Sequence, residues 1–422
     1  MKKNIFNVVM ALIAMCLMVA SCKPDNEEKT ITMVNYGLKL DMPLTIEKPT
    51  LSNAKAVFTN VQTKETFSFT EFKASDGQYV AVFSLPAGIY DVVVDGTVAY
   101  KVNGKDLSTN VKATQRNVTV DKGASEGSNP SLVLPLNTFN SGAGFVISEV
   151  FFAGTRTPQN KDYVDDQYIK IANNSDTVMY ADGLAIVQSL FQTNMKNDYK
   201  PNVMNSAMTV DDVFVIPGSG KEHPVQPGEE IVIAWNARNH KEFNTNSIDL
   251  SKANFQMYSS MTLEDVDENG EDIEKEVQND KVPLLLHWYG SDEGRLTPNR
   301  AGVRAYALVR IPMTAELLKK NYEYEIKWVE ADDPTNFENT ETHLMIPNVW
   351  VLDAVNLATT SDHQWNVVSA ALDAGFTSWA ETLYDAGSYR KAVLRKKEGK
   401  NWKDTNNSTQ DFDAFAVPSY FK

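Results

Sequence analysis

The stretch LPAGIYDVVVDG, residues 85–96, carries the clearest fold signal in this chain of 422 residues. Its apolar residues recur at every second position, at Tyr90, Val92 and Val94. This period is typical of a strand with one buried face and one solvent-facing side. The PAG before the run and the DG after it are turn sequences. The stretch therefore predicts a short strand bounded by two turns.

The same pattern continues over the first third of the chain. Apolar residues alternate again in 57–61 and 67–69, and further turn sequences occur at 76–77 and 103–104. Short strands at this spacing, without a long helical pattern, predict an antiparallel β-sandwich. Residues 85–96 also resemble the closing hairpin of immunoglobulin-like or transthyretin-like modules. That resemblance implies a spacer-type sandwich over residues 30–138.

A second pattern of strands begins at residue 144. Four sequences occur in the order seen in lamin-tail domains, which they resemble: GFVISEV (144–150), DQYIKIANNS (166–175), YADGLAI (180–186) and PGEEIVIA (227–234). The resemblance implies an immunoglobulin-like β-sandwich for residues 144–422. QYIK at 167–170 stands where that family often has EFIE. Any role of those two carboxylates in the family is therefore not carried over.

The remainder of the second domain is less regular. Residues 237–347 are expected to form a long insertion on the sandwich, because their strand pattern is looser. Short helices are predicted at 314–320, with Thr314 as the N-cap, and around 366–374. Residues 392–395 are interpreted as a strand that returns to the core. The predicted fold class is mainly β: two antiparallel, immunoglobulin-like β-sandwich domains, the second with an insertion containing short helices.

The N-terminus has the composition of an export signal. Lys2 and Lys3 are followed by an almost purely apolar run, residues 8–20. That run has 13 residues, whereas a helix needs about 20 to cross a bilayer. A cleaved signal peptide over residues 1–21 fits better than a transmembrane anchor.

The end of the apolar run predicts a lipid anchor. The sequence VASC at 19–22 resembles the lipobox of bacterial lipoproteins, in which small residues precede a cysteine that accepts a diacylglycerol. Cys22 is thus the predicted lipidation site; a plain signal peptide that happens to contain a cysteine is the alternative. Residues 22–29 form an acidic tether that resembles the surface-export signal of Bacteroidota lipoproteins, although such tails are also simply solvated. The predicted location is the outer membrane, facing outside.

Composition excludes several function classes. The chain has 40 basic and 55 acidic residues, a net charge of −15, and such an acidic surface disfavours binding to nucleic acid. The two cysteines are Cys16 and Cys22, so the rest of the chain has no disulfide framework, cysteine-ligated zinc or cysteine nucleophile. The five histidines show no metalloprotease spacing, and no nucleophile elbow or phosphate-binding glycine loop occurs. We therefore predict no enzymatic activity and no catalytic residue.

One acidic segment matches a calcium-binding loop. Residues 265–276 fit the pattern D-x-[DN]-x-[DN]-G-x₅-E, in which oxygen ligands at alternate positions surround a hard cation. The candidate ligands are Asp265, Asp267, Asn269, Glu271 and Glu276. The alternative is an acidic β-hairpin that turns at Asn269-Gly270, because Asn-Gly is a strong hairpin signal. Calcium is the one cofactor that the sequence makes possible.

An aromatic cluster suggests a ligand platform. All seven tryptophans lie in the second half of the chain, and His287, Trp288 and Tyr289 follow an apolar run. Aromatic faces can stack on sugar rings, although such rings more commonly fill cores. His287, Trp288 and Tyr289 are the candidate platform.

These features predict a lipid-anchored, non-enzymatic binding or accessory protein for nutrient uptake. The anchor partner is outer-membrane lipid, bound through Cys22; a TonB-dependent transporter or a glycan is a further candidate partner. The layout resembles an uncharacterised family of Bacteroidota lipoproteins often found with outer-membrane import systems. Two alternatives stay open: a hydrolase acting on glycans or phosphoesters, and a structural or adhesive surface protein.

Overall fold

The computed structural model describes residues 32–42, 48–75, 78–102, 104–121, 131–138, 144–257, 279–290, 298–330 and 337–422. The predicted signal peptide, Cys22, the acidic tether and the candidate calcium loop 265–276 all lie outside these residues. None of the helices in the described part of the chain is long and apolar enough to span a membrane.

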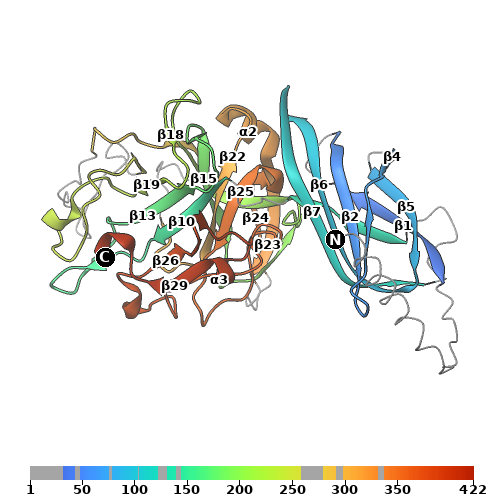
Figure 1. The fold of residues 1–422 in the computed structure, drawn as a ribbon. Coiled ribbons are helices and arrows are strands. Elements are labelled where there is room, and N and C mark those ends of the chain that lie inside the picture. Colours follow the sequence, from blue (N-terminus) through green and yellow to red (C-terminus); the bar gives the residue numbers. More distant parts are fainter. Residues whose placement is uncertain are drawn as a thin grey trace, which may run out of the picture.

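The first domain is a sandwich of two sheets (Figure 1). One sheet has the order β4-β5-β1-β8 and the other β3-β2-β6-β7-β9. Neighbouring strands are antiparallel except β1 and β8, which are parallel. The strands are β1 (Met33–Asp41), β2 (Thr50–Asn60), β3 (Thr66–Phe69), β4 (Lys73–Ser75), β5 (Gln78–Pro86), β6 (Gly88–Val102), β7 (Lys105–Val120), β8 (Leu132–Pro135) and β9 (Asn137–Thr138).

The stretch 85–96 forms the predicted strand, but only one of its two predicted turns. β5 ends at Pro86 and β6 begins at Gly88, where the Tyr90 hydroxyl donates to the Pro86 carbonyl at 2.8 Å. The second prediction is wrong, because Asp95-Gly96 lies inside β6. That strand pairs with β2 on one side and β7 on the other. Two ladders hold the backbone extended, which outweighs the local turn preference.

The second domain is also a sandwich of two sheets. The smaller has the order β20-β19-β13-β10-β26-β29, and the larger β16-β23-β24-β17-β15-β22-β25, with β21 paired to β17. The smaller sheet contains β10 (Phe145–Phe151), β13 (Tyr168–Asn173), β19 (Glu230–Ala234), β20 (Phe255–Gln256), β26 (Ala392–Arg395) and β29 (Phe412–Ala416). The larger contains β15 (Leu184–Gln192), β16 (Asn197–Lys200), β17 (Ala207–Val215), β21 (Leu286–Tyr289), β22 (Arg304–Arg310), β23 (Glu323–Glu330), β24 (Glu338–Pro347) and β25 (Val351–Asn356).

Short elements complete the second domain. The remaining strands are β11 (Thr155–Arg156), β12 (Asp162–Tyr163), β14 (Met179–Tyr180), β18 (Pro224–Val225), β27 (Lys397–Glu398) and β28 (Asn401–Trp402). The helices are α2 (Ala315–Tyr322) and α3 (Ser408–Asp411), with 3₁₀ turns at η1 (His240–Glu242), η3 (Asn348–Trp350), η4 (Ala386–Ser388) and η5 (Ser419–Phe421). The predicted fold class, mainly β with antiparallel sheets in sandwiches, is confirmed.

Residues 237–347 do not form a separate insertion, which corrects our expectation. β22 lies between β15 and β25 in the larger sheet, and β24 pairs with β17. The five central residues of β22 are buried, because this strand lies between two apolar layers. The segment thus supplies strands to the sandwich itself.

The two helix predictions had different outcomes. α2 is confirmed, and the Thr314 side chain accepts from the backbone N–H of Leu317 as its N-cap. No helix forms at 366–374. There the Asn356 side chain accepts from the N–H of Val367, and the Asp373 carboxylate accepts from the N–H of Asn356 and of Gly375. These side-chain bonds offer the backbone an alternative to a helix.

Both faces of the larger sheet are covered. One apolar cluster fills the space between the two sheets of the second sandwich. The other runs from the core of the first sandwich to the outer face of the larger sheet, and α2 contributes Leu318 to it. At this junction Leu136 and Val349, from the two domains, line one small pocket. The two sandwiches lie side by side (Figure 1). Apolar side chains from both belong to the same cluster, through which they pack against each other.

Candidate functional site

An irregularity in β17 places a carboxylate inside the second sandwich. The register with β15 pairs Asp212 with Gln188 but Val210 with Ser189, so Asp211 is an extra residue in a β-bulge. On its other side β17 pairs with β24 as far as Val210 and with β21 from Val213. Asp211 and Asp212 thus lie where one partner strand ends and the next begins.

A chain of hydrogen bonds ends at Asp212. The backbone N–H of Asn299 donates to the Tyr306 hydroxyl (3.1 Å), which donates to Gln188 Oε1 (2.6 Å). Gln188 Nε2 then donates to Asp212 Oδ2 (3.3 Å). Asp212 is only 6% exposed, and its other oxygen, Oδ1, has no partner among the described residues. Such an unpaired buried atom costs free energy, and a functional role is one explanation for it.

His287 brings a second unpaired atom to the same point. Its Nε2 is buried and has no partner in the described part of the chain, and its ring packs 4.8 Å from that of Phe214. Gly290, with φ +136°, packs closely against both groups. A Cβ added at Gly290 would lie 2.1 Å from Asp212 Oδ1 and 2.8 Å from His287 Nε2. The absence of a side chain at Gly290 therefore lets its backbone lie close to both atoms.

The electrostatics of this pair favour neutral forms. Burial raises the pKa of Asp212 to about 7; the Asp211 charge raises it further and Arg304 opposes the shift. Burial lowers the pKa of His287, against a hydrogen bond with the Tyr289 backbone. Near neutral pH the pair thus consists of a carboxyl group close to its titration point and a neutral imidazole. The arrangement can accept hydrogen bonds, exchange a proton or ligate a cation.

Asp212→Asn should stabilise the fold by about 1–3 kcal/mol at pH 8. The folded-state pKa near 7 exceeds the ordinary value of 3.8. Between these values the folded protein keeps a proton that the unfolded chain releases, so wild-type stability falls as pH rises. The gain should be absent near pH 4 and complete above pH 7. Urea unfolding at both pH values measures it; equal stabilities at pH 8 would contradict the buried charge.

Of the predicted platform, His287 belongs to this site. Trp288 and Tyr289 are half-buried and pack against the cluster on the outer face of the larger sheet. Tyr289 donates to the Thr342 carbonyl at 3.4 Å, and burial raises its pKa to about 12. The two half-buried rings therefore cover the sheet, and their assignment as part of a ligand platform stays a prediction. Asp265, Asp267, Asn269, Glu271 and Glu276 lie outside the described residues.

Sequence reasoning missed Asp212, which lies 75 positions before His287. A signal was present: Asp211-Asp212 interrupts the apolar strand sequence AMTVDDVFVI, residues 207–216. Adjacent acidic residues in an otherwise buried strand indicate a bulge or a site.

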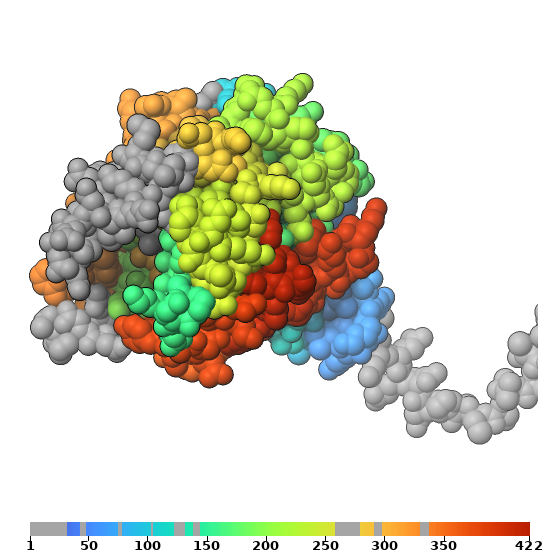
Figure 2. Space-filling view, turned by 90° about the vertical axis from the view of Figure 1, so that its left-hand side faces the viewer, coloured from blue at the N-terminus to red at the C-terminus, as the bar shows by residue number. Residues whose placement is uncertain are grey.

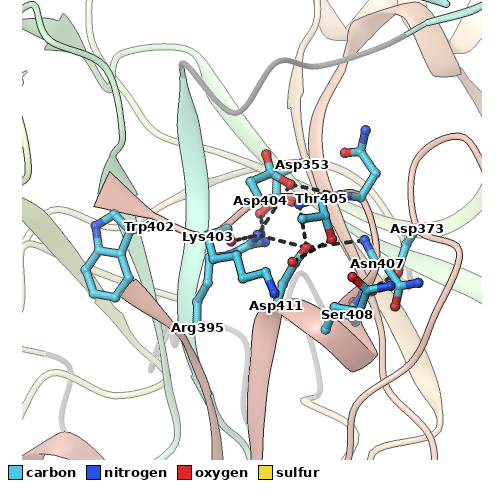
Figure 3. A network of polar contacts seen from close by, with 12 residues as sticks. Asp353, Asp373, Arg395, Trp402, Lys403, Asp404, Thr405, Asn407, Ser408 and Asp411 are labelled. Atoms are coloured by element: carbon cyan, nitrogen blue, oxygen red, sulfur yellow. Dashed lines mark hydrogen bonds and ion pairs between the residues drawn. The ribbon is translucent and has the colours of Figure 1, made fainter. Parts of the chain in front are cut away.

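A second polar network surrounds Arg395 (Figure 3). The guanidinium is almost fully buried and lies 2.6 Å from Asp353, 3.5 Å from Asp404 and 3.8 Å from Asp411. It also donates from Nε to the Ile147 carbonyl. Burial raises the pKa of Asp353 to about 7 despite Arg395. Because these contacts join β10, β25, β26 and the C-terminal loops, we interpret the network as structural.

A third cluster holds the C-terminus. Glu149 accepts from the Tyr168 hydroxyl (2.6 Å) and from the N–H and hydroxyl of Ser419 (2.8 and 2.6 Å). Lys170 lies 3.3 Å from Glu149 and donates to Ser419 Oγ. The lysine of QYIK thus forms an ion pair. The C-terminal segment, dark red in Figure 2, is held beside the residues that follow β19.

Among the described residues, one group of three side chains could together hold a metal ion. Ligand atoms of Asp182, Glu222 and His223 lie within 4.8 Å of one another. However, the Asp182 carboxylate already accepts from the N–H groups of Gly220, Glu222 and His223. These bonds lower its pKa and fix the loop. We therefore interpret Asp182 as a structural residue that holds this loop in place.

Residues 226–419, less than half of the chain, match a family described as "Protein of unknown function (DUF4876)". A crystal structure of a DUF4876 family protein from Bacteroides thetaiotaomicron has a similar fold, with a TM-score of 0.51 and 22% identity. That match covers 91% of this chain and 96% of that one. No curated protein matches.

These matches agree with the expected uncharacterised Bacteroidota family, whereas the immunoglobulin-like and lamin-tail-like assignments stay predictions. The chain is thus similar to DUF4876 proteins, in sequence over much of its second sandwich and in fold over most of its length.

Proposed function

We propose that this protein is a lipid-anchored binding protein of the outer membrane, facing outside, that takes part in nutrient uptake. The anchor is Cys22, at the end of the lipobox sequence 19–22. Two or more acyl chains on one cysteine hold a protein on a membrane far more firmly than one. The acidic tether 22–29 then joins the anchor to the first sandwich.

One observation carries the binding role. Asp212 Oδ1 and His287 Nε2 are buried and have no partner in the described part of the chain, and both lie within 2.8 Å of the point that a Cβ at Gly290 would occupy. Stable folds normally pair such buried polar atoms. The unpaired state of these two atoms is therefore best explained by a ligand that binds them. We call this pair, with Gly290, the Asp212–His287 site. A carboxyl group and an imidazole can bind a ligand without acting as a catalytic nucleophile.

The first sandwich supports the second. Its core is continuous with the apolar cluster on the outer face of the larger sheet. The two sandwiches would therefore project from the membrane as a unit, with the first as the spacer. A TonB-dependent transporter or a glycan as partner, and calcium bound at 265–276, stay predictions.

Cys22→Ala should abolish lipidation. In cells that express the full chain, palmitate labelling and sedimentation with the outer membrane should both be lost. Cys16→Ala is the matched control, because Cys16 lies inside the apolar run and would be removed with the signal peptide. Label that persists in Cys22→Ala, or that disappears in Cys16→Ala, contradicts the anchor. Protease treatment of intact cells tests outward exposure.

A further inference from the structure

We propose that the Asp212–His287 site binds a divalent transition-metal cation of the Zn²⁺ class. The inference rests on the proposed binding function and names the chemical class of its ligand. The juxtaposition that carries it is one carboxylate oxygen and one imidazole nitrogen, both beside Gly290 and both without a partner among the described residues.

The donor types point to this class of ion. A carboxylate oxygen and a neutral imidazole nitrogen are both ligands that Zn²⁺ and its neighbours accept. Ca²⁺ and Mg²⁺ prefer sites made of oxygen alone. An imidazole binds a metal through an unprotonated ring nitrogen, and His287 Nε2 has no hydrogen-bond partner among the described residues.

The surroundings hold both groups in place. Gln188 bonds the other oxygen of Asp212, and Gln188 is itself held by the Tyr306 hydroxyl. The His287 ring packs on Phe214. Metal ligands are commonly oriented by such outer contacts, whose loss weakens binding by about 10–100-fold. The carboxylate and the imidazole are therefore oriented before a ligand arrives.

The charges around the site suit a cation. Asp212 belongs to the site, and its neighbour Asp211 lies close enough to raise the pKa of Asp212. Glu323 raises the pKa of Tyr289, two residues after His287. Arg304 is paired with Asp211 at 3.0 Å, and Lys319 lowers the pKa of His287. With Asp212 ionised, these five groups carry three negative and two positive charges. An anion would meet net repulsion here, whereas a cation takes the place of the Asp212 proton.

Two protein ligands leave the other coordination positions open. Water or a second molecule would fill them, one position more than in catalytic zinc sites, which have three protein ligands and one exchangeable position. The site is thus suited to reversible capture. The Asp182–Glu222–His223 group differs, because its central carboxylate is saturated by backbone N–H groups.

Calorimetric titration with ZnCl₂ tests the inference, on the protein purified from membranes and freed of metal by chelation. We expect one saturable site and a higher unfolding temperature with bound metal. Asp212→Asn and His287→Gln should each weaken binding by at least about tenfold. His223→Gln is the matched control and should leave this site unchanged. Co²⁺ should give visible absorption bands that disappear in the same two variants.

The absence of heat and of a thermal shift with Zn²⁺, Co²⁺ and Mn²⁺ would overturn the inference. So would Zn²⁺ binding that survives in both site variants but is lost in His223→Gln. Neither result bears on the anchor, which Cys22→Ala tests separately. Asp212→Asn is expected to be stable, so its loss of binding is not a loss of folding.

Discussion

Arg395→Met should lower the free energy of unfolding by about 3–5 kcal/mol at pH 8, the cost of breaking a buried charge network from one side. Arg395 is the cation that faces the buried carboxylates of Asp353, Asp404 and Asp411. Methionine keeps much of the volume but leaves these groups without their counter-charge. Urea unfolding of the purified protein, followed by tryptophan fluorescence, measures the loss.

The pH dependence separates lost charge from lost packing. Burial raises the pKa of Asp353 to about 7 even with Arg395 present, so Asp353 takes up a proton as pH falls below that value. The loss caused by Arg395→Met should therefore be smaller at pH 5 than at pH 8. Lys396→Met is the control, because its partner Asp413 is exposed and 3.9 Å away. It should change stability by less than about 1 kcal/mol. A pH-independent loss would contradict the electrostatic explanation.

Gly290→Ala should both destabilise the fold and remove metal binding. A backbone at φ +136° costs an alanine about 1–3 kcal/mol. The new Cβ would also lie 2.1 Å from Asp212 Oδ1, and such crowding costs about 1–3 kcal/mol more. The displaced carboxylate can then no longer share a ligand with His287.

Gly220→Ala is the matched control for this substitution. Gly220 has φ +113°, but a Cβ there would meet nothing within 4 Å. It should therefore show the backbone cost alone and keep ZnCl₂ binding intact. If both variants lost the same free energy and both still bound Zn²⁺, the close approach of Gly290 to Asp212 and His287 would have no functional meaning. Unfolding curves and ZnCl₂ titration at pH 8 measure the two quantities.

Local patterns predicted the strands well where burial alternates. The run at Tyr90, Val92 and Val94 lies in β6 with these three side chains buried. Residues 392–395 form β26 as predicted, and Thr314 caps α2. These features depend on period and on short-range hydrogen bonds, which neighbouring residues set among themselves. The turn at Asp95-Gly96 failed because strands distant in sequence, β2 and β7, pair across it.

The candidate site was half predictable. His287 was a candidate because it lies beside two aromatic residues, but nothing near it in the sequence indicated Asp212 as its neighbour in the fold. The bulge at Asp211 turns Asp212 inward, and β21 brings His287 alongside. Both placements depend on the register between strands that are far apart in the chain. A sequence motif of fixed spacing therefore cannot predict such a pairing.

By itself, the sequence determined the β class and the two sandwiches, because periodicity and turns are local properties. The lipid anchor at Cys22, which depends on a short export motif, stays a prediction. Only the tertiary structure decided that residues 237–347 supply strands to the larger sheet, and that Arg395 meets three carboxylates. It also decided that Asp212 and His287 both lie beside Gly290. The reason is physical: burial and pairing between distant strands fix which polar atoms stay unpaired, and only the folded chain brings those strands together.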